Sequence, residues 1–147
     1  MKNNLLTSYQ PINLSMGILV IRLIIGVLMA FYGYQKLINF ETMAVSEFWA
    51  KEVSFLGMTG KIPLALTIFA ELFCSLLLIV GLFTRFALIP LLICMGYIIA
   101  CVAKFEVIYS GDNGMEMNTA FVYFLIYFGL LLTGPGNYSL DYKVANR

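Results

Sequence analysis

The sequence predicts an all-α protein, a polytopic four-helix bundle integral to a membrane. Of its 147 residues, 61% are hydrophobic and only 12% are charged. A soluble domain of this length usually carries about twice that proportion of charged residues, so we infer that lipid surrounds this chain. Four long apolar stretches follow one another, and backbone groups in lipid must be hydrogen-bonded within their own segment. We therefore expect one membrane domain over residues 1–147, built from helices.

The first helix is predicted at about residues 16–37. The segment is too long for a cleaved signal peptide, contains Arg22 and lacks a small-x-small cleavage site. One face of this helix carries Arg22, Gly26, Met29, Gly33 and Lys36. Such a face, polar at both ends and small between them, is typical of buried packing between membrane helices.

The connection that follows, about residues 38–61, is too apolar for a free linker. It contains Phe48, Trp49, Phe55 and Leu56. Amphipathic segments with large apolar side chains lie in the membrane interface. We therefore predict an interfacial loop here.

The second and third helices are predicted at about residues 62–83 and 86–104. The stretch "GLFTRF" leaves almost no connection between them, so they form a tight antiparallel hairpin. Gly81 belongs to this turn and packing motif. The second helix carries a carboxylate, Glu71, near its centre.

The fourth helix is predicted at about residues 115–133 and ends in "TGPGNYS". Gly134 can adopt the left-handed conformation that ends a helix, and Pro135 prevents its continuation. Gly136 completes the motif, and Tyr138 and Tyr142 follow at the depth of an aromatic belt.

An even number of spans places both termini on one side of the membrane. Outside the spans, Lys and Arg number four on each side, so the positive-inside rule decides little. Arg22, near the entry of the first helix, tips the balance. We predict a multi-pass protein of a bacterial inner membrane with both termini in the cytoplasm.

A carboxylate at the centre of a bilayer costs about 2.5–3.5 kcal/mol on insertion scales, so Glu71 needs an explanation. With both spans centred on the midplane, Arg22 and Glu71 lie about 9–10 Å apart along the axis, and we predict an ion pair between them. Lys36 lies farther away and is expected to snorkel to the interface. The pair is either structural or part of a ligand or proton site, and a third possibility is a protonated, unpaired Glu71. The polar membrane site comprises Arg22, Glu71, Lys36, Gln35, Tyr32, Tyr97, Lys104 and Tyr123.

Composition removes several kinds of chemistry. The chain contains no histidine, the commonest metal and haem ligand, so we expect it to ligate neither metal nor haem. The net charge of +1, without a basic run, gives no basis for nucleic-acid binding. Cys74, Cys94 and Cys101 form no C-x-x-C motif, and we expect small buried hydrophobic side chains. A redox pair of Cys74 with Cys94 is the alternative.

Four stretches of the sequence resemble the DoxX family of small four-helix membrane proteins. They are "VIRLIIGVLMAFYGYQKL", "AELFCSLLLIVGLFTR", "GMEMNTAF" and "GPGNYSLD", and the resemblance extends over Gly17–Asp141. It implies that Glu116, at a recurring acidic position, also belongs to the site. Two features depart from the family pattern: Tyr32 stands where many relatives have histidine, and Cys74–Ser75 replaces a common glycine pair.

The family takes its name from a subunit of a thiosulfate:quinone oxidoreductase, and the resemblance implies a redox-linked membrane subunit. We consider three functions. The first is an accessory subunit of a quinone-linked redox complex, inactive alone, with quinone contacting Tyr32, Lys36, Lys104, Tyr97 and Tyr123. The second is a transporter of protons or a small molecule, and the third an assembly or anchoring protein. Expected partners are the lipid bilayer and either a soluble redox protein or further copies of the chain.

Overall fold

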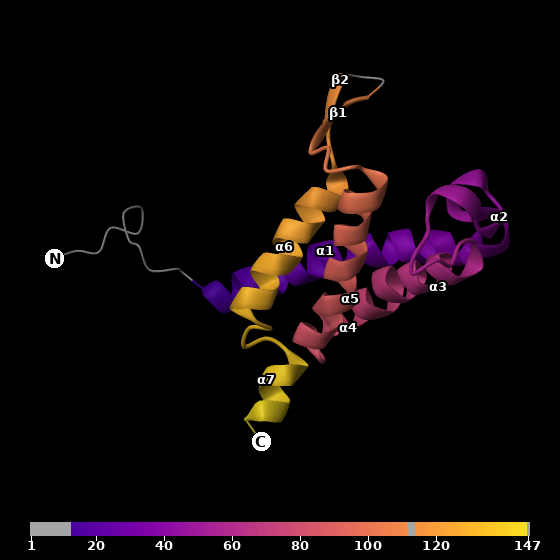
Figure 1. Ribbon diagram of the computed structural model, residues 1–147. Helices are drawn as coiled ribbons and strands as arrows, with labels where there is room; N and C mark the ends of the chain where they lie inside the picture. Colours follow the sequence, from indigo (N-terminus) through magenta and orange to yellow (C-terminus); the bar gives the residue numbers. More distant parts are fainter. Residues whose placement is uncertain (1–12, 112–113, 147) are drawn as a thin grey trace.

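A computed structural model describes residues 13–111 and 114–146 (Figure 1). Its α-helices are α1 (Leu14–Ile38), α2 (Phe40–Ala44), α3 (Lys61–Ile68), α4 (Ser75–Val80), α5 (Thr84–Tyr97), α6 (Thr119–Thr133) and α7 (Leu140–Ala145). Its π-helical segments are η1 (Phe48–Glu52), η2 (Phe69–Cys74) and η3 (Ile98–Val102), and its strands are β1 (Ile108–Gly111) and β2 (Gly114–Met117).

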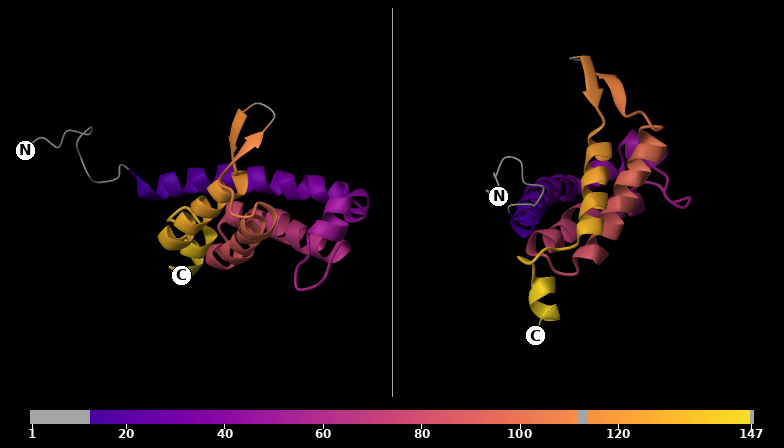
Figure 2. Two further views of the ribbon diagram at one scale, coloured as in Figure 1. Left: turned by 45° about the horizontal axis from the view of Figure 1, so that its top comes forward. Right: turned by 90° about the vertical axis from the view of Figure 1, so that its left-hand side faces the viewer.

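Four main helices form the fold, which confirms the predicted all-α membrane architecture. α3, η2 and α4 are continuous over Lys61–Val80, and α5 continues through η3 to Val102. These two helices and α1 are long and apolar enough to cross a membrane, and α6 is a shorter apolar helix. Figures 1 and 2 show two antiparallel pairs: α1 with α3–α4, and α5 with α6. The second pair crosses the first steeply. In the right-hand view of Figure 2, α1 is seen nearly end-on while α5 and α6 stand upright.

Glycines set how α1 lies against the second helix. A Cβ added at Gly33 would stand 2.6 Å from the backbone nitrogen of Leu72, and one at Gly26 would stand 2.6 Å from Cγ1 of Ile79. Both distances are far below an ordinary contact, so only glycine permits this approach. The predicted packing face of α1 is therefore correct, with Arg22, Gly26, Met29 and Gly33 all buried.

The helix ends agree with the sequence at most points. Asn13 caps α1, its side chain accepting a hydrogen bond from the Met16 amide at 3.0 Å. Gly81 ends α4 in the left-handed conformation, and Gly134 ends α6 with a positive φ. Gly136 packs beside Ile18 and Ser15. The beginning of α1, the turn after α4 and the end of α6 thus meet at one end of the molecule, whose cytoplasmic placement stays a prediction.

The predicted start of the fourth helix is wrong. Residues 114–117 form β2, which pairs with β1 as an antiparallel hairpin projecting from the helices (Figure 1). α6 begins only at Thr119, because the Asn118 side chain accepts a hydrogen bond from the Ala120 amide at 3.0 Å and caps the helix there. The apolar residues before Asn118 belong to a strand and extend no helix.

The 38–61 loop is folded onto the protein. It forms α2 and η1, and buries Trp49 and Val53 against Leu64 and Ile68 of α3. The Gly60 amide donates a hydrogen bond to the Trp49 carbonyl at 2.7 Å and closes the loop. The apolar content that predicted an interfacial segment is thus partly explained by a second, smaller core, separate from the main core between the four helices.

Candidate functional site

The ion pair inside the helices joins Lys36 to Glu71, so the predicted Arg22–Glu71 pair is wrong. The Lys36 ammonium donates hydrogen bonds to both carboxylate oxygens of Glu71. The Glu71 side chain is only 3% exposed and that of Lys36 is 20% exposed. Lys36 therefore does not extend to the membrane surface as predicted, and neutralises the buried carboxylate instead.

Arg22 has a different environment, in which backbone carbonyls are its hydrogen-bond acceptors. Its side chain is completely buried. The guanidinium donates to the carbonyls of Leu78 and Ile79, at 3.0 and 3.2 Å, and to that of Pro135. The first two are among the last carbonyls of α4, which have no partner within their own helix. Arg22 thus joins α1, α4 and the Gly134–Gly136 turn.

The pairing was mispredicted because the helix register was assumed. Centring both spans on one midplane brought Arg22 level with Glu71. In the structure Gly33 lies against the backbone of Glu71 and Leu72, and Gly81 lies against the Arg22 guanidinium. This displacement along the axis brings Lys36 to Glu71, and leaves Arg22 at the far end of α4.

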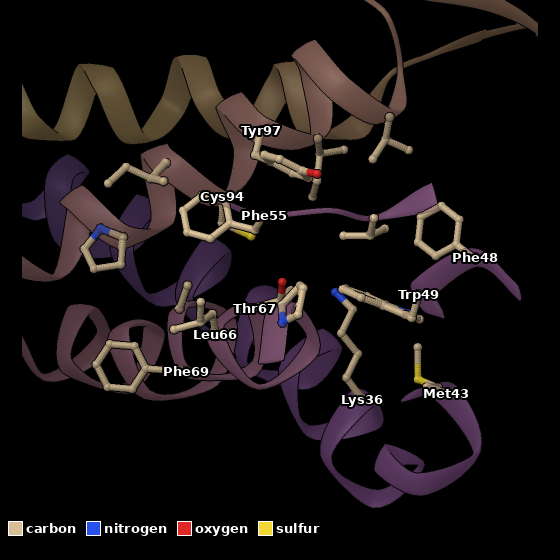
Figure 3. A pocket seen from close by; sticks show the side chains of 17 residues that line it. Lys36, Met43, Phe48, Trp49, Phe55, Leu66, Thr67, Phe69, Cys94 and Tyr97 are labelled. Carbon is tan, nitrogen blue, oxygen red and sulfur yellow. The ribbon is translucent and has the colours of Figure 1, made fainter. Parts of the chain in front are cut away.

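Beside the Lys36–Glu71 pair lies a cavity of about 540 Å³ (Figure 3). It is bounded by the folded 38–61 loop, the second helix and the third helix. The residues that line it are Lys36, Met43, Phe48, Trp49, Val53, Phe55, Pro63, Leu66, Thr67, Phe69, Ala70, Pro90, Ile93, Cys94, Tyr97, Ile98 and Val102. Lys36 is the one charged residue among them, and Figure 3 shows its ammonium directed into the cavity near Thr67.

All three π-helical segments contribute to this cavity. η1 supplies Phe48 and Trp49, η2 supplies Phe69 and Ala70, and η3 supplies Ile98 and Val102. Short π-helical segments are rare and occur frequently at functional sites. Glu71 itself lies in η2. The irregular parts of three different elements thus converge on one site.

Aromatic rings form much of the wall. The rings of Phe55 and Tyr97 pack edge to face, with centroids 5.8 Å apart. The Tyr97 hydroxyl donates a hydrogen bond to the Ser54 carbonyl at 2.6 Å, which holds the 38–61 loop against the third helix. Leu66, Phe69 and Ile93 line the cavity and are also exposed on the outer surfaces of their helices. The cavity therefore opens towards the surface that faces lipid.

The structure brings together only part of the predicted polar site. Lys36 and Tyr97 line the cavity, and Glu71 lies directly behind Lys36. The remaining members lie elsewhere: Tyr32 and Gln35 are exposed on α1, Lys104 is exposed after η3, Tyr123 is buried against Tyr127 with ring centroids 6.0 Å apart, and Glu116 lies in β2.

Sequence reasoning missed Trp49, Phe55 and Thr67 as residues of this site. Thr67 is one turn before Glu71 on the same face, which was a usable signal. The two aromatic residues reach the site only because the loop folds back, and no sequence pattern indicated that.

The cysteines differ from one another in exposure. Cys74 is buried, Cys94 lines the cavity and Cys101 is exposed, so the prediction of three buried cysteines is wrong for Cys101. All three are free. Within residues 13–111 and 114–146, no three His, Cys, Asp or Glu side chains gather as a metal site would require.

Asp141 organises the other end of the molecule. Phe83 occupies the N-cap position of α5, and its apolar side chain forms no capping hydrogen bond. The Asp141 carboxylate accepts hydrogen bonds from the amides of Phe83 and Thr84 at 2.7 and 2.8 Å and replaces the missing cap. Partial burial opposes ionisation of Asp141, but these hydrogen bonds and the nearby Arg22 charge outweigh it, so the pKa of Asp141 lies below its usual value.

Comparison with known proteins yields one family. The family model DoxX matches residues 17–104, which include most of α1, the folded loop and the second and third helices. No curated protein and no solved structure matches the chain.

Proposed function

This chain belongs to the DoxX family of membrane proteins, and we propose that it is a quinone-contacting accessory subunit of a membrane redox complex. The observation that carries the proposal is the cavity beside Lys36. Its volume of about 540 Å³ falls within the range of roughly 300–1,000 Å³ found for ligand pockets. Such pockets are mainly apolar, with a few polar groups that orient the ligand.

The cavity supplies what a quinone needs. A quinone has a flat ring, two carbonyl oxygens that accept hydrogen bonds, and an apolar tail. Lys36 and the Thr67 hydroxyl offer donors, and Trp49 and Phe55 offer flat apolar surfaces. The exposed rim at Leu66, Phe69 and Ile93 lets the tail remain in lipid.

The residues of this chain bind and orient the ring, while a bound quinone would supply the capacity to accept electrons and protons. The chain has no histidine and no C-x-x-C motif, which favours a partner protein as the source of electrons. We therefore expect the isolated chain to turn over no substrate, and we expect soluble redox proteins to co-purify with it in mild detergent.

Trp49 is the single tryptophan of the chain and provides the test. In lipid nanodiscs, a short-chain quinone added to the protein should quench Trp49 fluorescence in a saturable way. Thr67→Val and the double variant Lys36→Met/Glu71→Leu should each weaken binding about tenfold, which corresponds to one lost hydrogen bond to a polar or charged donor. Lys61→Met removes a lysine that pairs with Glu41 at the surface and should leave binding unchanged.

A relocated reporter distinguishes binding from collision in the bilayer. Trp49→Phe/Phe128→Trp moves the indole to the exposed face of α6. Quenching of this variant should rise linearly with quinone, without saturation. Saturation at both positions, or at neither, would show that quinone is only dissolved in the lipid. Substrate turnover by the purified chain alone would contradict the accessory role.

A second candidate, proton transport, is favoured by the polar groups behind Glu71. Ser75 and Tyr127 are completely buried, and neither hydroxyl has a hydrogen-bond partner among the described residues. Proteoliposomes of the chain alone, loaded with a pH-sensitive dye, test this function. Proton flux that disappears in Tyr127→Phe and Glu71→Gln would favour transport over the accessory role.

A further inference from the structure

A second groove, of about 620 Å³, lies at the opposite end of α1 from the Lys36 cavity. It is lined by the beginning of α5, the end of α6 with the turn that follows it, and α7. Figure 1 shows α7 below the junction of these helices, far from α2. The groove and the proposed quinone site have no lining residue in common.

Arg85 is the only cationic residue that lines this groove within residues 13–111 and 114–146. Its side chain is exposed and lies against Gly134, where an added Cβ would stand 3.6 Å from the guanidinium. Among the described residues, Lys51 and Lys61 each pair with a carboxylate, whereas Arg85 pairs with none. An exposed guanidinium without a protein carboxylate has its donors available for an external anion.

Asp141, the carboxylate that lines the groove, does not pair with Arg85. Asp141 accepts hydrogen bonds from the backbone amides of Phe83 and Thr84 and lies near Arg22. Its charge is thus compensated by the amides at the beginning of α5 and by the buried arginine. The groove keeps one free positive charge at its surface.

Large apolar side chains flank that charge. Phe83 and Phe86, on either side of Arg85 in sequence, are 66% and 68% exposed. Tyr142 lines the groove and is also exposed. Tyrosine is enriched at the depth of the lipid headgroups, whereas phenylalanine is purely apolar. From Tyr142 we therefore expect Arg85 to lie at the depth of lipid phosphates, with Phe83 and Phe86 available to acyl chains.

We propose that this groove binds the headgroup of an anionic phospholipid. The phosphate contacts the Arg85 guanidinium, whose paired N–H groups match phosphate oxygens. Asn137 and the Tyr142 hydroxyl line the same groove and supply further donors. The acyl chains pack over Phe83 and Phe86. The lipid thereby joins the turn between the second and third helices to the C-terminal segment.

Native mass spectrometry of the full chain in mild detergent tests this site. Phosphatidylglycerol and phosphatidylcholine are added at equal concentration, and retained lipid is counted. Phosphatidylglycerol should be retained preferentially, and Arg85→Gln should lower its retention about tenfold, the effect of one charge-assisted contact. Lys143→Gln removes an exposed cation of α7 that does not line the groove and should change little.

Two further measurements fix the interpretation. Phe86→Ala should weaken retention of the lipid, and excess inorganic phosphate should fail to displace it, because phosphate lacks acyl chains. Arg85→Lys keeps the charge and should retain binding in part. It replaces Arg85→Gln as the test variant if Arg85→Gln does not fold. Equal retention of both lipids, unchanged retention by Arg85→Gln, or full displacement by phosphate would overturn the proposal.

Discussion

Arg22 and Lys36, towards the two ends of α1, have their positive charges stabilised in opposite ways. Arg22 is fully buried, with neutral carbonyls of α4 and of the turn at Pro135 as acceptors, and does not line the Lys36 cavity. Lys36 pairs with a carboxylate, retains partial exposure and faces the cavity. The contrast indicates that the Arg22 end is built for rigidity, while the Lys36 end holds a charge where a ligand can reach it.

The largest effect should come from breaking the rigid end. Arg22→Ala removes the donors that satisfy three carbonyls and leaves a hole between α1 and α4. We expect it to lower the free energy of unfolding by about 3–5 kcal/mol, as breaking a fully buried polar network does. Unfolding in detergent, followed by circular dichroism against added SDS, measures this loss. Stability equal to that of wild type would show that the contacts of Arg22 are dispensable.

The Lys36 end should respond less, because the cavity gives a stranded lysine some access to solvent or ligand. We expect Glu71→Ala to cost about 2 kcal/mol, below the range for fully buried pairs. The double variant Lys36→Met/Glu71→Leu should recover much of this loss, whereas Arg22→Met/Glu71→Leu should not. A double-mutant cycle on the same SDS unfolding assay checks both. Coupling of Glu71 to Arg22 in place of Lys36 would reverse the comparison.

A change at Asp141 tests whether the Arg22 end depends on the cap that this residue supplies to α5 from a distant part of the sequence. Asp141→Asn should cost about 1 kcal/mol, the usual value of a side-chain cap. The pKa of Asp141 is lowered by folding, so its contribution is fully present above its unfolded-state pKa. The contribution is then lost as the pH falls through its folded-state value. Thermal unfolding across the acid range should show a steeper loss for wild type than for Asp141→Asn, and parallel curves would exclude the linkage.

The smallest change in stability is expected at a surface ion pair, which provides a reference for the larger changes. Lys61 and Glu41 form an ion pair whose side chains are both largely exposed. Lys61→Met should change stability by less than about 1 kcal/mol, since exposed pairs contribute little. A larger loss in the same unfolding assay would show that the folded 38–61 loop depends on this surface contact.

Much of the fold could be predicted, because lipid imposes simple rules. The approximate lengths of the first three helices, the packing face with Gly26 and Gly33, and the end at Gly134 follow from the bilayer and from backbone sterics. The partner of Glu71 could not be predicted from depth alone, since register along the helix depends on which glycines meet which backbone. The hairpin at Glu116 was missed because Met115 and Met117 continue an apolar pattern on either side of it.

The candidate site was harder to predict than the fold. Lys36 and Tyr97 were identified because polar side chains are rare in apolar helices. Trp49 and Phe55 reach the cavity through a folded loop, and π-helical segments have no sequence signal of their own. A site assembled from irregular backbone is therefore visible only in three dimensions.

The contacts of Arg22 have a consequence for the order in which the chain is made. The carbonyls of Leu78 and Ile79 lie 56 and 57 residues after Arg22, but that of Pro135 lies 113 residues after it. A nascent chain halted before it reaches Pro135, just after α6, therefore carries a guanidinium that lacks one of its acceptors within the bilayer. Only a chain that extends through Pro135 closes this bond, so the environment of an arginine in the first helix depends on a turn that is made after the fourth.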